Sequence, residues 1–315
     1  MKSHGKALSL LISAFFIAAT STIAFAQTAN CAFQQLNFSS PATNGNVVAL
    51  SDLGGILGVW TDSLDRGRGF LLFRGKLTTF NFPGAFETIP SDLSRNGIIV
   101  GTFDNGGDMI HPFMVHDGGF HEIALPGFPN TFATAQGVNA NGDVVGTIAN
   151  GFALGLGYLL HKGKLTIISF PGAKGGTMAT SINDEGVIVG NYAPDTTGVF
   201  HGFMWKNGVF SNIRPPDTAG AVIVNKISNS GVVVGTYVAP RGGELLFDGF
   251  AFKDGTYTKI LVPNTRQTFI QGVNKFGNVV GRSQNGGITD QFKGCLLYTS
   301  PSPRDTERSR MPSSA

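Results

Sequence analysis

The sequence predicts an all-β protein, folded as a β-propeller of about six four-stranded blades. A nine-residue element returns six times along the chain, with its first glycines 43, 45, 44, 45 and 46 residues apart. An aromatic-rich run follows each of the first five copies, and a further run that ends near proline comes after a short turn. Regular periods of about 20 to 50 residues are typical of solenoids, propellers and arrays. A ring of seven blades and an open β-solenoid are the alternatives.

The nine-residue element has the form of a tight hairpin turn between the first and second strands of each repeat. Its copies are LSDLGGILG (50–58), LSRNGIIVG (93–101), VNANGDVVG (138–146), INDEGVIVG (182–190), ISNSGVVVG (227–235) and VNKFGNVVG (273–281). In the third copy Asn139 can hydrogen-bond to its own backbone two residues on, and Gly142 supplies a positive φ that other residues resist. The predicted structural turn glycines are Gly54, Gly97, Gly142, Gly186, Gly231 and Gly277.

The runs that follow these turns indicate strands covered on both faces. Residues 187–189 (VIV) and 232–234 (VVV) are apolar at consecutive positions, which a sheet with one solvated face does not favour. Blades packed face to face provide such an environment. Each of the first five repeats also carries one aromatic residue at a fixed position in its third strand. We expect these rings to lie in the core between blades rather than to form a stacking surface: Phe70, Phe113, Tyr158, Phe203 and Phe250.

One segment falls outside the simple repeat count and predicts how the ring closes. Residues 33–38 (FQQLNF) match the fourth strand of the later repeats, such as KLTTFNFP (76–83). A fourth strand at the start of the chain has no blade of its own. We therefore expect it to complete the last blade, beside residues at or beyond 269, because an open propeller would leave unpaired strand edges.

The N-terminal residues predict export. Lys2 and Lys6 precede an uncharged, mostly apolar run over 7–18, and Ala24 and Ala26 form an A-x-A cleavage site. The run is too short to favour a membrane span. We predict a signal peptide over 1–26, with the mature protein beginning at Gln27 and secreted to the periplasm or the cell exterior.

The C-terminal residues break every pattern that precedes them. Residues 295–305 (CLLYTSPSPRD) resemble the conceptual translation of a transposase sequencing adapter. We therefore expect 295–315 to be an artefactual, disordered tail that packs on nothing, and the repeat domain (27–294) to be truncated at its C-terminus.

The ends also account for the charge of the chain. The formal net charge is +3, of which Lys2 and Lys6 supply two and residues 295–315 supply one, so residues 27–294 carry none. A nucleic-acid or anionic-membrane partner thus has no support from net charge. With Cys295 discounted, only Cys31 remains, which leaves no disulfide framework, so the fold must be stabilised by its hydrophobic core.

The repeats resemble the extracellular HAF-repeat family of bacteria, which pairs an I-N-x-x-G-x-V-V-G element with a downstream His-Ala-Phe type of strand. The fourth copy matches most closely, with INDEGVIVG (182–190) followed by HGFMW (201–205). The third strands of repeats one, three and five instead have Arg68, Leu156 and Asp248 at the histidine position. The resemblance covers nearly all of 33–294 and implies an exported, propeller-like protein, and it carries over no catalytic residue.

No catalytic residue, cofactor or metal site is predicted. Four histidines invite a metal interpretation, but they lack an H-x-x-x-H or cysteine-supported spacing: His111, His116, His121 and His201. Asn139, Asn141 and Asp143 surround Gly142 in the manner of a calcium loop. The distal bidentate carboxylate of such a loop is missing and a hydrophobic strand follows, so the turn interpretation is preferred.

The loops between the second and third strands vary most in sequence, and in a propeller they emerge on one face together with the connections from the fourth strand to the next blade. Function on a repeat scaffold usually resides in such loops. The candidate binding residues there and at the adjoining strand ends are Asp62, Asp65, Arg66, Asp104, Asp108, His111, Asp195, His201, Arg241 and Glu244. The alternative is that these loops are solvated connectors without a ligand.

These features favour a secreted binding or surface-interaction scaffold that uses the loops on one propeller face. A carbohydrate-active enzyme on the same scaffold is the first alternative, although the chain has no G-x-S-x-G element or sialidase-type Ser-Asp box. A structural component of an envelope or matrix is the second. The expected partner is an extracellular protein or polysaccharide of unknown identity, with no nucleic acid and no membrane span, and the chain is expected to be a monomer.

Overall fold

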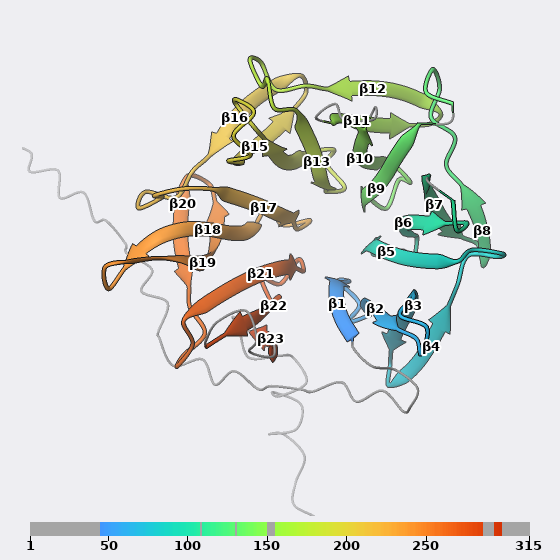
Figure 1. Ribbon diagram of the computed structural model, residues 1–315, viewed down its shortest axis with the longest axis horizontal. Helices are drawn as coiled ribbons and strands as arrows, with labels where there is room; N and C mark the ends of the chain where they lie inside the picture. The colour runs from blue at the N-terminus through green and yellow to red at the C-terminus, as the bar shows by residue number, and fades with distance from the viewer. Residues whose placement is uncertain (1–44, 108, 130, 150–154, 286–292, 298–315) are drawn as a thin grey trace, which may run out of the picture. The chain divides into compact units, whose positions relative to one another are not determined.

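The computed structural model describes residues 45–107, 109–129, 131–149, 155–285 and 293–297, all within the compact unit Cys31–Ala315. Within these segments the chain forms six antiparallel sheets, which we call blades 1 to 6 (Figure 1). Blade 1 comprises β1 (Gly45–Leu50), β2 (Ile56–Thr61), β3 (Gly67–Phe73) and β4 (Lys76–Phe80). Blade 2 comprises β5 (Glu87–Leu93), β6 (Ile99–Asp104), β7 (Ile110–His116) and β8 (Gly119–Glu122), and blade 3 comprises β9 (Phe132–Val138), β10 (Val144–Ala149), β11 (Leu156–His161) and β12 (Lys164–Ile168).

The remaining blades follow in the same order. Blade 4 comprises β13 (Thr177–Ile182), β14 (Ile188–Tyr192), β15 (His201–Lys206) and β16 (Val209–Ile213). Blade 5 comprises β17 (Val222–Ile227), β18 (Val233–Arg241), β19 (Glu244–Lys253) and β20 (Thr256–Ile260). The described strands of blade 6 are β21 (Gln267–Val273), β22 (Val279–Gln284) and β23 (Lys293–Leu297).

The six blades form a closed ring, which confirms the predicted propeller. The first strands of successive blades, β1, β5, β9, β13, β17 and β21, lie innermost and contact one another in turn, and β21 then contacts β1 (Figure 1). At this closure the backbone N–H of Lys275 donates to Asp52 Oδ1 at 2.8 Å. The open β-solenoid is therefore excluded, and the described residues form six blades rather than seven.

The predicted turns between first and second strands have the expected geometry. All six turn glycines adopt a positive φ, between 76° and 91°. Asn139 Oδ1 accepts hydrogen bonds from the N–H groups of Asn141 and Asp143, both at 3.0 Å. Its amide nitrogen donates to Asp143 Oδ2 at 2.8 Å. The oxygen that a calcium loop would direct to a metal ion is thus occupied by the turn's own backbone, as the turn interpretation predicts.

Replacing Gly142 or Gly186 with valine is expected to lower the free energy of unfolding by about 1 kcal/mol or more, because a β-branched residue tolerates positive φ poorly. Their φ values are 79° and 76°, and at most one distant atom lies near the added Cβ, so the cost comes from the backbone and not from a clash. Gly107→Val is the matched control, because that glycine lacks a positive φ and has open space around it. Urea melts that show equal losses in all three variants would rule the turn assignment out.

A second glycine in each repeat is required by close packing. Gly190 of β14 lies opposite Phe203 of β15. A Cβ at Gly190 would lie 2.0 Å from the backbone oxygen of Met178 and 2.9 Å from the Phe203 ring. The predicted core aromatics occupy this site in five blades and are fully buried: Phe70, Phe113, Tyr158, Phe203 and Phe250. The ring of the third strand therefore covers the glycine of the second strand, which confirms the core assignment of these rings.

The consecutive apolar residues of the second strands are covered on both faces, as predicted. Ile188, Val189, Val233 and Val234 are each 0% exposed. Val189 belongs to the cluster between blades 4 and 5, whereas Ile188 packs in the cluster between blades 3 and 4. Each blade thus contributes both faces of its sheet to the core.

Every inner strand also contains a β-bulge at the same place, which the sequence did not reveal. The register of β17 on β18 shifts between Val224 and Lys226, and that of β5 on β6 shifts between Pro90 and Asp92. A bulge adds one unpaired residue and re-aims the side chains near it. In blades 2 and 5 the residues that follow the bulge, Asp92 and Lys226, contact each other across the ring.

The expectation for the C-terminal residues needs a correction. Residues 293–297 form β23, in which Cys295 pairs with Gly281 and Leu297 with Val279, so the prediction that 295–315 packs on nothing is wrong for 295–297. The third-strand position of blade 6 offers the unpaired edge of β22, and an extended apolar segment satisfies its backbone groups. The rest of the predicted tail, the predicted signal peptide (1–26) and the predicted closing strand (33–38) lie outside the described residues.

Candidate ligand-binding face

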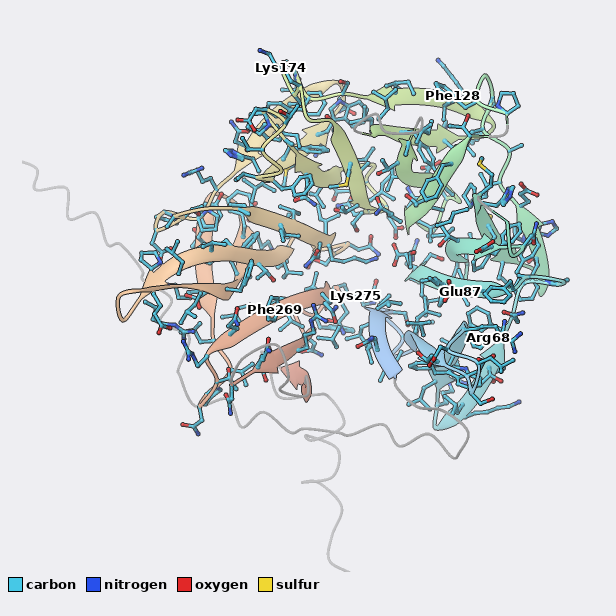
Figure 2. All side chains as sticks on the ribbon, viewed as in Figure 1. Arg68, Glu87, Phe128, Lys174, Phe269 and Lys275 are labelled. Carbon is cyan, nitrogen blue, oxygen red and sulfur yellow. The ribbon has the colours of Figure 1, made fainter. Side chains whose placement is uncertain are left out.

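The loops between second and third strands share one face of the ring with the linkers between blades, as predicted. At four blade junctions a linker N–H donates to the carbonyl of a residue in the second strand of the next blade or directly after it. These pairs are Phe86 to Asp104, Gly175 to Ala193, Ala219 to Val238, and Arg266 to Gln284. We call this side the loop face and the opposite side, which carries the glycine turns, the turn face. Figure 2 places Lys174, in one of these linkers, at the outer rim of the ring.

On blade 1 the loop-face charges are paired with one another. Asp62 is buried and accepts hydrogen bonds from Arg66 Nε at 2.9 Å and Arg68 Nε at 3.1 Å. Arg68 Nη1 also donates a hydrogen bond, at 3.0 Å, to the backbone oxygen of Phe86 on the linker to blade 2. Burial alone would raise the pKa of Asp62, but the hydrogen bonds from Arg66, Leu64 and Arg68 hold it well below its ordinary value. The cluster stabilises the loop and joins blade 1 to blade 2, near Glu87 in Figure 2.

This cluster predicts a pH dependence. A carboxylate with a depressed pKa in the folded state contributes stability above its unfolded pKa of about 4, and loses it as the pH falls through the folded pKa. The difference in unfolding free energy between the wild type and Asp62→Asn should therefore be largest above about pH 5 and shrink on acidification. Asp65→Asn, which removes an exposed carboxylate from the same loop, is the control for the effect of losing one negative charge. Urea melts from pH 7 to pH 3 in which the difference grows on acidification would contradict this account.

The signature histidines of blades 2 and 4 pack against aromatic residues. The Phe82 ring of the linker stacks on Phe103 at 3.8 Å between centroids, and Phe103 stacks on His111 at 5.1 Å. His111 Nδ1 lies 2.9 Å from Glu122 Oε1. In this blade the histidine therefore extends a stack that holds the linker against the blade.

Blade 4 repeats the arrangement. Phe170 stacks on Tyr192 at 3.7 Å, and the His201 ring lies 5.5 Å from Tyr192. Burial, followed by the nearby Arg214, lowers the pKa of His201, and Asp195 opposes this shift. Blade 3 has Leu156 at the histidine position, with Ile148 opposite it, so there the same place is apolar.

On blade 5 the same position carries a buried carboxylate. Asp248 is 0% exposed. Lys259 Nζ lies 3.2 Å from Asp248 Oδ2, and Arg241 Nη2 lies 3.4 Å from Asp248 Oδ1. Lys259 also donates to Asp217 Oδ2 at 2.6 Å, and the Tyr237 hydroxyl donates to Asp217 Oδ1 at 2.8 Å. We call these five residues the blade 5 cluster.

The electrostatics of the blade 5 cluster favour the charged forms of Lys259 and Asp217. Burial raises the pKa of Tyr237 to about 12, with a contribution from Asp217. Burial would raise the pKa of Asp217, but Lys259 and Tyr237 lower it. Desolvation opposes the charge of Lys259, yet Asp217, Tyr237 and Asp248 raise its pKa. The cluster thus presents fixed charges of both signs on the loop face.

The sequence suggested that Arg241 and Glu244 lie in an irregular loop, and the structure corrects this. They form the last pair of the longest hairpin, in which β18 and β19 pair from Val233 with Phe252 to Arg241 with Glu244. The turn consists of Gly242 and Gly243, both with positive φ. Two such residues make a turn whose twist matches the flanking strands, so the strands continue where other blades have loops. Glu244 forms an exposed ion pair with Arg266 of the following linker.

The other predicted loop residues take local roles. Asp104 Oδ1 accepts a hydrogen bond from Gly106 N–H at 2.7 Å, and Asp195 Oδ1 accepts one from Thr197 N–H at 2.9 Å. Asp65 adopts a positive φ of 55°. Asp108 lies outside the described residues. The candidate residues are thus spread around the loop face and do not converge on one point.

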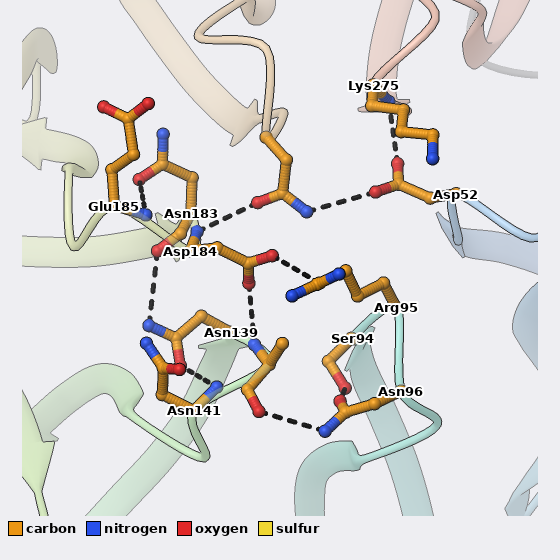
Figure 3. A network of polar contacts seen from close by, with 12 residues as sticks. Asp52, Ser94, Arg95, Asn96, Asn139, Asn141, Asn183, Asp184, Glu185 and Lys275 are labelled. Carbon is orange, nitrogen blue, oxygen red and sulfur yellow. Dashed lines mark hydrogen bonds and ion pairs between the residues drawn. The ribbon is translucent and has the colours of Figure 1, made fainter.

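The turn face is built differently, because its turns bond to one another around the axis of the ring (Figure 3). Ala140 N–H donates to Asp184 Oδ1 at 2.8 Å, and Asp184 N–H donates to Asn229 Oδ1 at 2.9 Å. Asn229 Nδ2 in turn donates to Asp52 Oδ2 at 3.1 Å. Arg95 Nε approaches Asp184 Oδ2 at 2.7 Å. The inner end of this face is thus joined by hydrogen bonds from blade to blade.

A buried ion pair lies deeper in the ring. Lys226 Nζ contacts Asp92 Oδ1, although β17 and β5 belong to blades on opposite sides. Asp92 Oδ2 also accepts a hydrogen bond from Val138 N–H at 3.0 Å. Both residues follow the bulges of their strands, and the equivalent positions carry small residues, Ala49, Gly137, Ser181 and Gly272. The lysine can therefore reach across the ring.

The described residues show neither a cluster of metal-ligand side chains nor a helix that could span a membrane. They contain no group of three or more His, Cys, Asp and Glu side chains arranged to hold a metal ion. They also contain no helix long and apolar enough to cross a membrane.

No family model and no curated protein matches this sequence. Among solved structures, the chain is similar to TolB from Acinetobacter baumannii, with 14% identity and a TM-score of 0.46 over 68% of this chain; it spans 56% of the TolB chain. It is also similar to the β-propeller domain of the Trilobed protease from Pyrococcus furiosus (11% identity, TM-score 0.48, 81% of this chain and 95% of that one). The six-bladed fungal lectin of Aleuria aurantia gives 15% identity and a TM-score of 0.44 over 81% of this chain and 96% of the lectin.

Proposed function

We propose that the protein is an exported binding module that holds its ligand on the loop face of the propeller. The observation that carries the proposal is the contrast between the two faces. On the turn face, polar groups at the inner ends of the blades are bonded to one another, and the buried atom there without a hydrogen bond among the described residues is the neutral Asn278 Oδ1. On the loop face, the blade 5 cluster holds buried charged atoms of Asp248 and Arg241 that lack hydrogen bonds within the described residues. Buried polar groups without such bonds are rare and costly, and they are often found at functional sites.

The blade 5 cluster supports binding over catalysis. Glycoside hydrolysis needs two carboxyl groups that reach the substrate from both sides of the bond. Asp217 is 45% exposed, but Asp248 is completely buried behind Arg241 and Lys259. One reachable carboxylate can orient a ligand but does not supply the acid and base of that reaction.

The proposal is tested by calorimetric titration of the exported protein with a panel of soluble extracellular polysaccharides and oligosaccharides. We expect saturable binding that is lost in a loop-face variant, Arg241→Gln with Lys259→Met, and kept in a turn-face variant, Lys206→Gln. Lys206 forms an exposed ion pair with Glu185. Release of new reducing ends would favour the enzyme alternative, and equal loss of binding in both variants would contradict the loop-face assignment.

Export is part of the same proposal and has its own test. Mass analysis of the mature N-terminus should give a chain that begins at Gln27, free or cyclised. An intact Met1, or a lipid on Cys31, would overturn it.

A further inference from the structure

The exposed edge of the blade 5 cluster combines hydrogen-bond donors and acceptors within one small area. Asp217, Lys259 and Arg241 are 45%, 36% and 31% exposed in their side chains, whereas Tyr237 and Asp248 are buried behind them. Asp217 comes from the linker before blade 5, Arg241 from the end of β18 and Lys259 from β20. A ligand on this surface would therefore meet one carboxylate and two cations from three separate segments.

The hydrogen bonding of this cluster is incomplete among the described residues. Both oxygens of Asp248 and the Nε and Nη2 atoms of Arg241 are buried, and no hydrogen bond of standard geometry reaches them from the described residues. The contacts of Asp248 with Lys259 and Arg241, at 3.2 and 3.4 Å, are ion pairs without hydrogen-bond geometry. Asp248 thus holds both cations from the buried side. A ligand on the loop face can reach only the exposed part of the Arg241 side chain and the Lys259 ammonium group, which has three N–H donors and contacts two carboxylates.

The charges of the cluster restrict what can bind beside it. Asp217 and Asp248 balance Arg241 and Lys259, so the four groups carry no net charge. An anionic ligand would bond to the cations but would be repelled by the two carboxylates. A cationic ligand would bond to the carboxylates but would be repelled by the two cations. A hydroxyl group can donate to Asp217 and accept from Arg241 or Lys259 at the same time, because it is both donor and acceptor.

From this balance we infer that the blade 5 cluster is a subsite for a neutral polyhydroxylated ligand, a saccharide without acidic or basic groups. The inference rests on the proposed function and names its ligand class. Asp217, Arg241 and Lys259 contact the ligand, and Asp248 is a positioning residue that acts through the two cations. The β18–β19 hairpin, tied to the next linker by Glu244 and Arg266, holds Arg241 beside the site.

The same place on blades 1, 2 and 4 lacks this chemistry. On blades 2 and 4 the histidines complete aromatic stacks whose inner rings, Phe103 and Tyr192, are buried. On blade 1, Arg68 is bonded to Asp62, Asn81 and Phe86. We therefore expect one subsite of this kind per chain among the described blades.

The test is titration of the full chain with matched oligosaccharides of one backbone: a neutral form, a form with uronic acids and a form with amino sugars. We expect the neutral form to bind with a stoichiometry of one. Asp217→Asn, Arg241→Gln and Lys259→Met should each weaken it by about 10-fold or more, the worth of a hydrogen bond to a charged group. Lys206→Gln on the turn face should leave the affinity unchanged. Thermal melts establish that each variant is folded.

Asp248→Asn separates positioning from contact. Because the variant loses one negative charge beside the two cations, it should bind the neutral form more weakly and shift its preference toward the uronic acid form. Stronger binding of the uronic acid form by the wild type would make the cluster an anion site, and stronger binding of the amino sugar form would make it a cation site; both overturn the inference. Binding that blade 5 variants leave intact but Asp62→Asn or Glu122→Gln weakens would overturn this inference and keep the proposed function. Failure of every saccharide to bind overturns the inference.

Discussion

Replacing Lys226 with methionine is expected to lower the free energy of unfolding by about 3–5 kcal/mol, the usual cost of removing one partner from a buried ion pair. Asp92 is 4% exposed in its side chain and Lys226 is 11% exposed, so water cannot take the place of the lost ammonium group. The Asp92 carboxylate would keep its hydrogen bond from Val138 but lose its counter-charge.

Urea unfolding measures this loss, with Lys206→Met as the exposed control. The double variant Asp92→Leu with Lys226→Met should be more stable than the single variant, because it leaves no uncompensated charge and buried pairs are often replaceable by apolar residues. Equal losses for Lys226→Met and Lys206→Met would mean that the pair across the ring does not form in solution.

Replacing Gly190 with alanine is expected to cost about 3 kcal/mol or more, at the upper end of the range for overpacked cores. The added Cβ would meet the backbone oxygen of Met178 at 2.0 Å, and a backbone atom inside a sheet cannot move aside as a flexible side chain can. The β13–β14 ladder would therefore have to shift.

Gly107→Ala is the control, because nothing lies within 4 Å of its Cβ position. Adding Phe203→Leu to Gly190→Ala should recover only part of the loss, since the ring is the second contact and the backbone oxygen the first. Full recovery would show that the ring, and not the backbone, limits the space at this glycine.

Much of the fold follows from the repeat alone. The spacing of Gly142 and Gly186 predicted the hairpin turns, and the apolar run at 187–189 predicted a strand covered on both faces. These features depend on residues close in sequence, where backbone conformation and local hydrogen bonding dominate. The β18–β19 hairpin could also have been predicted, because Gly242 and Gly243 between apolar runs are a strong signal for a two-residue turn.

The candidate site was predicted only in part, because its contacts join residues that are far apart in the chain. Asp248 was recognised as a departure from the histidine pattern, but nothing in the sequence indicated that Lys259 and Asp217 would lie beside it. The pair of Lys226 with Asp92 depends on ring closure and on bulges in two inner strands. The prediction for 295–297 failed because composition alone does not show that β22 presents a free edge.

Hydrogen exchange of the full chain with and without a bound neutral oligosaccharide tests the central claim most directly. Ligand held on the loop face should slow exchange in peptides that cover 214–221 and 238–248, where the amides of Ala219 and Val238 join the linker to the long hairpin. Peptides that cover the turns at 139–143 and 183–187 should exchange at the same rate in both states. Protection confined to those turns, with no change over 214–221 and 238–248, would contradict the assignment of the loop face as the binding surface.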